Sequence, residues 1–110
     1  MQKNTPVFAR ILSSISQIQS SAGDISLAGL IIFFHVCERD GIGIKELIFL
    51  SGFSESLVSR AVDRLVRNHG ENESGLIRVE KHAKDGRRRF LYLTEKGHGL
   101  RDRLVEMLPS

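Results

Sequence analysis

GIKELIFLSGFSESLVSRAVDRL, residues 43–65, predicts two short helices joined by a tight turn. The first helix covers roughly residues 44–50, and Gly52 in the turn can take the left-handed backbone conformation that ends a helix. Ser54 is a suitable N-cap for the second helix, which we expect to run to about Asn68. Two helices around a glycine-containing turn form the helix-turn-helix pattern, in which the second helix can enter the DNA major groove.

On a helical wheel, the second helix divides into an apolar side and a side of hydroxyls and charges. The side expected to pack on a core comprises Val58, Ala61, Val62 and Leu65. The free side comprises Ser56, Ser59, Arg60, Asp63 and Arg67, with Arg64 at its border. Hydroxyls and arginines make phosphate contacts and base-edge hydrogen bonds. An ordinary solvated helix face carries the same residue types, so this helix alone gives the two interpretations about equal weight.

A basic hairpin is predicted next, within LIRVEKHAKDGRRRFLYLT, residues 76–94. Apolar and polar residues alternate at its start, and residues 90–93 form a second β-prone run. Asp85-Gly86 between them is a strong hairpin-turn signal. Five cations lie from Lys81 to Arg89, against the single carboxylate of Asp85. We therefore expect a cationic wing over residues 76–93, which can lie along a DNA backbone or reach into the minor groove.

These pieces together resemble the MarR-type winged-helix transcription regulators. The matching pieces are VSRAVDRLV, GLIRVEKHAKDGRRR and LYLTEKG, and the resemblance covers about residues 44–108. It implies a mainly α fold with a small antiparallel β-hairpin (α+β), in which the three pieces are the recognition helix, the first wing strand with the wing tip, and the lead into a C-terminal helix. Residues 68–74 are longer than the family's usual turn, and the C-terminal helix is shorter than the family's dimerising helices.

Length and charge agree with a single DNA-binding domain. The 110 residues contain no repeat or linker, so residues 1–110 are expected to form one winged-helix domain, with residues 44–68 as its helix-turn-helix. The net charge of +3 is unevenly placed. Residues 1–59 carry four Lys/Arg and five Asp/Glu, whereas residues 60–110 carry twelve and eight. The basic C-terminal half points to a polyanionic partner.

Cys37 is the single cysteine, so no internal disulfide is expected, and a cytoplasmic location follows as the default. The N-terminal residues lack a signal-peptide core. The longest apolar run, residues 27–34, is far below the roughly 20 residues that span a bilayer, so no membrane partner is expected. We expect Cys37 to be a buried small hydrophobe. His35 lies two helical positions away and points elsewhere, so a shared metal ion is not expected.

Two amphipathic helices are predicted at the ends of the chain, over about residues 5–20 and 95–108. The first carries the apolar stripe Val7, Phe8, Ile11, Leu12, Ile15 and Ile18. The second follows Thr94 as N-cap and carries Leu100, Leu104, Met107 and Leu108. Each can pack on its own domain or on a second copy of the chain. The resemblance favours a homodimer, because MarR-type regulators dimerise through their terminal helices.

A central helix is predicted over residues 24–40, capped by Asp24 or Ser26. It is apolar nearly all round, so we expect it to be buried centrally. Residues 41–44 are a candidate third strand beside the wing. No nucleophile elbow, phosphate loop, His-Glu-x-x-His or Cys-x-x-Cys motif is present, so we expect neither an enzyme nor a bound cofactor or metal.

The combined prediction is a transcription regulator that binds specific sequences of double-stranded DNA, and the resemblance implies a homodimeric repressor. The expected DNA-binding residues are Ser54, Glu55, Ser56, Ser59, Arg60, Asp63, Arg64 and Arg67 on the helix-turn-helix and Lys84, Arg87, Arg88 and Arg89 on the wing. Arg60 is the best candidate for a guanine edge. One alternative is a winged-helix protein–protein interaction module, and another is a replication or partition protein of a mobile element. No polar cluster marks a pocket for a small-molecule effector.

Overall fold

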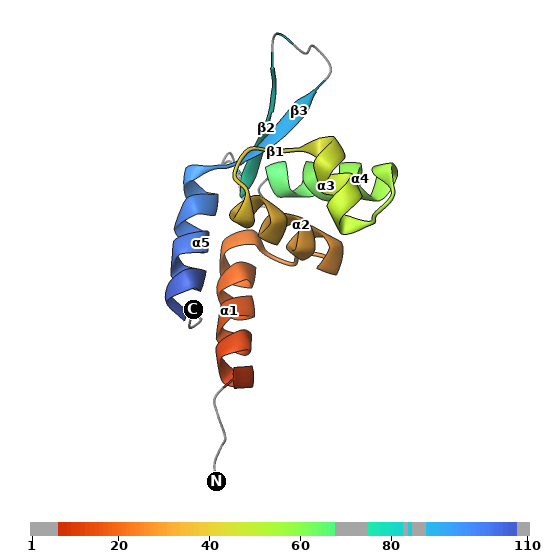
Figure 1. The fold of residues 1–110 in the computed structure, drawn as a ribbon. Helices are drawn as coiled ribbons and strands as arrows, with labels where there is room; N and C mark the ends of the chain where they lie inside the picture. The colour runs from red at the N-terminus through yellow and green to blue at the C-terminus, as the bar shows by residue number, and fades with distance from the viewer. Residues whose placement is uncertain (1–6, 68–74, 83, 85–87, 108–110) are drawn as a thin grey trace.

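The computed structural model describes residues 7–67, 75–82, 84 and 88–107. The helices in these ranges are α1 (Val7–Ala22), α2 (Leu27–Glu38), α3 (Ile44–Ser51), α4 (Glu55–Val66) and α5 (Glu95–Met107). The strands are β1 (Ile42–Gly43), β2 (Ile77–Lys81) and β3 (Arg89–Leu93). Figure 1 shows a group formed by α2, α3 and α4 on one side of the sheet, a hairpin rising above it, and α1 and α5 side by side below. The predicted α+β winged-helix architecture is confirmed.

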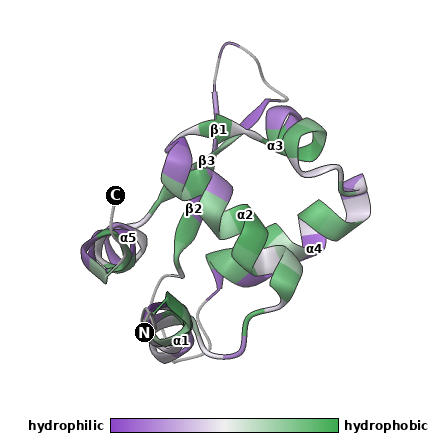
Figure 2. Cartoon of the chain, turned by 60° about the horizontal axis from the view of Figure 1, so that its bottom comes forward, coloured by the Kyte–Doolittle hydropathy of each residue, from purple (hydrophilic) through white to green (hydrophobic). Residues whose placement is uncertain are grey.

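The core lies where α2, α4 and the sheet meet. Figure 2 shows the hydrophobic α2 in the middle of this group, with α4 beside it. Phe33 of α2, Val58 of α4 and Leu91 of β3 are fully buried there. The apolar side predicted for α4 is confirmed, because all four of its residues are buried: Val58, Ala61, Val62 and Leu65.

The turn between α3 and α4 follows the prediction closely. Gly52 has φ 73°, and its N–H donates to the Ile48 carbonyl at 3.0 Å, which ends α3. The Ser54 hydroxyl accepts the Leu57 N–H at 3.2 Å and caps α4. Helix α4 ends at Val66, slightly earlier than expected, because Arg67 has an extended backbone. Residues 68–74 lie outside the described ranges.

The sheet is antiparallel, with β3 in the centre and β1 and β2 on its two sides. The short third strand expected at residues 41–44 is therefore confirmed as β1. The second wing strand begins at Arg89, one residue before the predicted run. Strand β3 pairs with β1 through Gly43↔Phe90 and with β2 through Lys81↔Arg89. The predicted Asp85-Gly86 turn lies outside the described residues.

Helix α2 is less enclosed than its composition predicts. Its N-cap is Ser26, whose hydroxyl accepts the Gly29 N–H at 3.0 Å. The side that faces the core is buried, but Leu27 and Phe34 are exposed. The helix is therefore central, as expected, but it is not buried all round. Helix α2 lies in the middle of the helical group, but the described elements leave Leu27 and Phe34 uncovered.

The terminal helices contact each other through polar groups as well as apolar ones. The Arg103 guanidinium of α5 donates to Gln17 Oε1 and Ser21 Oγ of α1, both at 3.1 Å. Five of the six stripe residues of α1 are exposed: Val7, Phe8, Ile11, Leu12 and Ile15. Only Ile18 of the stripe is buried. In the described ranges no one helix has the length and apolarity to cross a bilayer, although α1 and α2, bent by 96° at their junction, pass that test together.

Candidate nucleic-acid interface

The free face of α4 is open to solvent over its whole length. Exposed residues are Ser54, Glu55, Ser56, Ser59, Arg60, Asp63, Arg64 and Arg67. Arg67 forms an ion pair with Asp63 at 3.3 Å, one helical turn away. Within the described ranges, Arg60 and Arg64 have no carboxylate partner. Two guanidinium groups of this helix are therefore available for an external anion.

A groove of about 430 Å³ separates α4 from the wing, and we call it the reading groove. One wall carries Ser59, Arg60 and Asp63 of α4, and the other carries Lys81 and Arg89 of the wing strands. The apolar residues between the walls are Ile44, Val62, Val66 and Val79. The fold thus brings Ser59, Arg60, Asp63 and Arg89 of the predicted site together around one channel.

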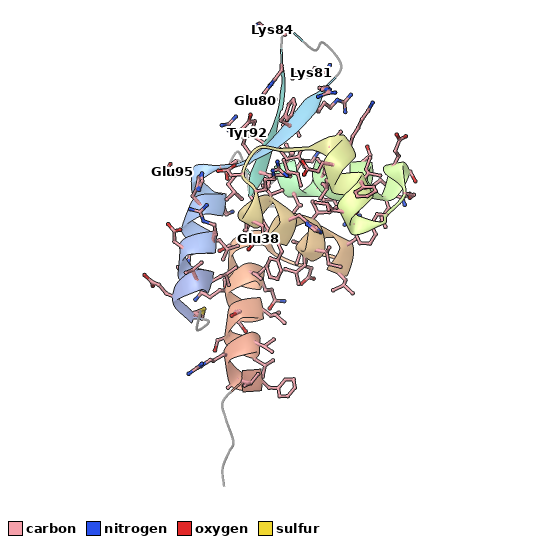
Figure 3. The ribbon with its side chains drawn as sticks, viewed as in Figure 1. Glu38, Glu80, Lys81, Lys84, Tyr92 and Glu95 are labelled. Atoms are coloured by element: carbon pink, nitrogen blue, oxygen red, sulfur yellow. The ribbon has the colours of Figure 1, made fainter. Side chains whose placement is uncertain are left out.

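Lys81 and Arg89 are direct cross-strand partners in the β2–β3 pair. Both side chains line the reading groove, and neither has a carboxylate partner among the described residues. Like charges directly opposite each other destabilise a sheet. A bound phosphate between the two cations would offset that repulsion. Figure 3 shows Lys81 on the wing.

Sequence reasoning counted Lys81 among the wing cations but did not place it in the site. The signal was present, since Lys81 has the same strand parity as Ile77 and Val79, which directs it to the side of the sheet that faces α4. The other predicted wing residues are distributed differently. Lys84 lies at the far end of the hairpin and is exposed, as is Arg88. Arg87 lies outside the described residues.

Arg64 and Arg67 do not line the reading groove. They border a separate cavity of about 20 Å³ beside the α1–α2 link, together with Lys96 of α5. The helical wheel placed both on or beside the free side of α4, but it carries no information on which part of that side meets the wing. Arg60 therefore lines the reading groove and Arg64 does not, although the two residues lie one helical turn apart.

On the opposite face of the wing, the charged side chain of Arg78 has partners within the wing itself. Arg78 forms an ion pair with Glu80 and lies over the Tyr92 ring, with its guanidinium carbon 4.9 Å from the ring centroid. The His82 ring stacks on Phe90 at 4.0 Å, and its Nε2 lies 3.2 Å from the Tyr92 hydroxyl. These contacts tie β2 to β3 and neutralise Arg78. Lys81 and Arg89, which have no carboxylate partner within the described ranges, lie on the α4 side instead.

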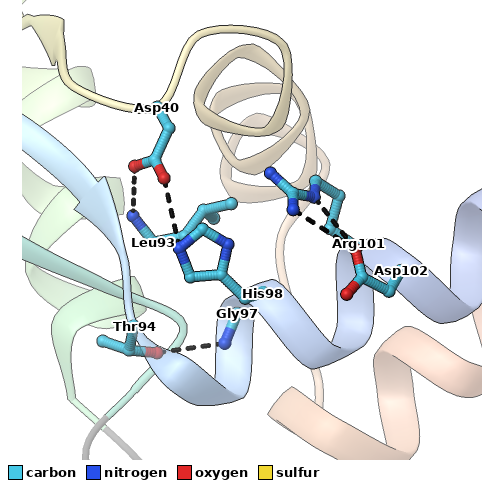
Figure 4. Close-up of polar contacts among 7 residues, drawn as sticks. All are labelled: Asp40, Leu93, Thr94, Gly97, His98, Arg101 and Asp102. Carbon is cyan, nitrogen blue, oxygen red and sulfur yellow. Dashed lines mark hydrogen bonds and ion pairs between the residues drawn. The ribbon is translucent and has the colours of Figure 1, made fainter.

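Polar contacts also hold the base of the wing, as Figure 4 shows. Asp40, after α2, accepts the Leu93 N–H at 2.9 Å with Oδ1, and its Oδ2 lies 3.2 Å from His98 Nε2 of α5. Thr94 accepts the Gly97 N–H at 3.0 Å and donates to the Gly75 carbonyl at 2.6 Å. The expected Thr94 cap of α5 is confirmed. One carboxylate therefore connects the end of β3 to α5.

Other kinds of chemistry have little support in this geometry. In the ranges that the structure describes, no three His, Cys, Asp or Glu side chains gather as a metal site requires. Cys37 is half-buried, and desolvation raises the pKa of its thiol to about 12, although the Arg101 guanidinium acts in the opposite direction. A thiol held so far from ionisation is a poor nucleophile.

Comparison with known proteins identifies the fold. No protein-family model matches the sequence, and no curated protein matches it either. Among solved structures, a SlyA-like transcription regulator from Listeria monocytogenes is 25% identical, with a TM-score of 0.64 over 97% of this chain and 69% of that one. The transcriptional regulator SlyA is 27% identical, with a TM-score of 0.63 over 91% and 66%. MarR is 20% identical, with a TM-score of 0.63 over 92% and 71%.

These neighbours are named as transcription regulators or as MarR itself, and this chain shares their overall fold. This similarity supports a DNA-binding regulator and confirms the resemblance found in the sequence. The chain has a winged helix-turn-helix fold that is similar to the folds of MarR and SlyA.

Proposed function

We propose that this protein binds specific sequences of double-stranded DNA as a homodimeric transcription repressor in the cytoplasm. Helix α4 reads base edges in the major groove, and the wing cations contact the phosphate backbone. The observation that carries the proposal is the Lys81↔Arg89 pair, two opposed cations that face the exposed Arg60 across the reading groove. A surface of this kind favours a phosphate-bearing partner.

The roles of individual residues follow from where they lie. Arg60 lines the groove and has no described carboxylate partner, so its guanidinium can form a bidentate contact with a guanine edge. Ser56 and Ser59 supply hydroxyls for neighbouring bases or phosphates. Glu55 follows the Ser54 cap in the first turn of α4, where free N–H groups can meet a phosphate. Lys84, Arg87, Arg88 and Arg89 make sequence-independent contacts.

Arg60→Ala tests the base-reading role, with Arg64→Ala as a matched control on the same helix. We expect Arg60→Ala to cost about 1–3 kcal/mol of specific binding and to relax the preference at one base pair. Arg64 lies away from the reading groove, so Arg64→Ala should weaken specific and random duplexes equally. Selection of bound fragments from a random DNA pool, followed by titration at several salt concentrations, measures both. Equal loss of specific and random binding by Arg60→Ala would refute the role.

The homodimer is supported by the exposed stripe of α1. Phe8 is 78% exposed and Leu12 is 65% exposed, on a side of the helix that Arg103 of α5 does not contact. Five large apolar side chains in one exposed stripe form a patch of the kind that marks a protein interface. A second copy of α1 is a self-complementary occupant, as a two-fold dimer requires. MarR-type regulators dimerise through such terminal helices, which the resemblance carries over to this chain.

Leu12→Asp tests the dimer, with Ser13→Asp as its control. Leu12 belongs to the stripe, whereas Ser13 is exposed on another side of α1. An unpaired carboxylate inside an apolar interface is costly, so Leu12→Asp should sediment as a monomer. Its affinity for a two-half-site duplex should fall by a factor on the order of 10²–10⁴, because bivalent binding is lost. If Ser13→Asp dissociates the dimer equally well, the stripe is not the interface.

The protein-interaction module remains the second candidate, because the exposed Phe49 and Leu50 of α3 lie in the helix-turn-helix itself. Salt separates the two candidates. Affinity for DNA should fall by orders of magnitude between about 50 and 200 mM salt, whereas an apolar protein interface should respond little. Bound genomic sites would further distinguish a promoter regulator from a replication or partition protein.

A further inference from the structure

A second cationic groove of about 310 Å³ lies between the wing and the start of α3, and we call it the flanking groove. It arises because β1 is only two residues long. Gly43 pairs with Phe90, but at Ile44 the chain turns into α3 and leaves β3. The residues of β3 on the tip side of Phe90 therefore have no partner on that edge within the described chain. The space between Arg88-Arg89 and the first turn of α3 remains open.

Four cations from three segments line the flanking groove. Arg39 comes from the end of α2, Lys45 from α3, and Arg88 and Arg89 from the wing. Among the described residues of its lining, Glu46 is the single carboxylate, and this group already forms an ion pair with Arg39. Lys45, Arg88 and Arg89 have no carboxylate partner among the described residues. The groove therefore carries an excess of positive charge that the described chain does not compensate.

The two grooves share part of their lining. Ile44 and Arg89 line both of them, so the cationic surface runs from Arg60 on α4, past the wing strands, to Lys45 on α3. Several cations on one path suit a chain of phosphates better than an isolated charge on a ligand. No expected contact residue lay on α3 or in the turn before it, so this path extends the interface beyond the predicted one.

We propose that the flanking groove is a phosphate-binding site in which Lys45 and Arg88 hold a backbone phosphate of the bound duplex. The proposal rests on the proposed function for the source of the phosphate. Glu46 has a defined role in it, because its carboxylate holds Arg39 and lowers the positive potential of the groove. Removing that carboxylate releases a fourth cation toward the phosphate.

Opposite effects from two adjacent residues provide the test. Lys45→Ala should lower the affinity for specific and random duplexes by the same factor, about tenfold near 0.1 M salt, and reduce the salt slope by about one unit. Glu46→Gln should raise both affinities and steepen the slope. Arg10→Ala removes the same charge from the far end of α1 and should change neither. A purely structural role for Lys45 would not predict the gain from Glu46→Gln.

A second arm identifies the source of the anion. Inorganic phosphate is titrated into the DNA-free wild type and Lys45→Ala while the amide resonances of Lys45, Glu46 and Phe90 are followed. One outcome is that the resonances shift saturably in the wild type only, while Lys45→Ala leaves the affinity for DNA unchanged. In that case the groove binds phosphate, but a free phosphate and not a phosphate of the duplex. If neither arm shows an effect, the site is refuted, even when Arg60→Ala relaxes specificity. If the wild type binds no duplex, the proposed function is refuted. The phosphate titration then tests by itself whether the flanking groove binds phosphate.

Discussion

Helices α4 and α1 are both amphipathic, but the apolar side of α4 is buried and that of α1 is exposed. Val58 of α4 is completely buried, whereas Leu12 of α1 is 65% exposed. Helix α4 lies against α2 within the core, while α1 extends away from the body with α5 along one side (Figure 1). An amphipathic pattern shows that a side of a helix needs cover. It does not show whether that cover comes from the same chain.

The largest expected difference is in the free energy of unfolding when one apolar side chain is truncated on each helix. Leu65→Ala removes a buried side chain of α4 and should lower the free energy of unfolding by about 2–5 kcal/mol. Leu12→Ala, with an exposed side chain, should change it by less than about 0.5 kcal/mol in a dilute, monomeric sample. Urea denaturation monitored by circular dichroism measures both. Similar losses in the two variants would mean that α1 is covered within its own chain.

A smaller effect is expected at the start of α4. The Ser54 hydroxyl caps the helix through the Leu57 N–H, so Ser54→Ala should cost about 1 kcal/mol. Ser59 is exposed in the middle of the same helix and provides the control, because Ser59→Ala should leave the free energy of unfolding nearly unchanged. The same denaturation experiment applies. A cap that costs nothing would indicate that packing of the apolar side alone places α4.

A further effect, on reactivity and pH dependence, concerns Cys37 of α2, which packs against the core. Burial raises the pKa of its thiol to about 12, so iodoacetamide should modify the native protein at pH 8 at least about a hundredfold more slowly than the unfolded chain. The native state keeps this proton where the unfolded state loses it. Stability should therefore fall as the pH rises from the ordinary thiol pKa toward 12, and Cys37→Ala should lack that part of the decrease. Fast modification of the native thiol would show that α2 is not covered there.

Much of the fold could be predicted because the determining signals are local. The Gly52 turn, the Ser54 cap and the four buried positions of α4 all depend on residues within a few positions of one another. The exposure of Leu27 and Phe34 could not be predicted, because composition does not show which part of α2 the other helices and the sheet leave uncovered. For the same reason, the sequence could not show which surface covers the apolar stripe of α1.

The residues of the candidate site could be proposed from the sequence one by one, but their arrangement could not. Arg60 and Arg64 look alike on a helical wheel, and only the position of the wing separates them. The opposition of Lys81 and Arg89 depends on the register of the hairpin, which alternation of residue types does not determine. Lys45 was not among the expected contacts because its role depends on where β1 stops pairing with β3.

Asp40 links the base of the wing to the terminal helix α5. Its two oxygens connect the end of β3 to His98 on α5, and α5 lies along α1. In a dimer joined through α1, a change in the angle between the two copies would therefore carry each wing with it. The separation of the two DNA half-sites would then be set far from the DNA, by the crossing angle of helices that never touch it.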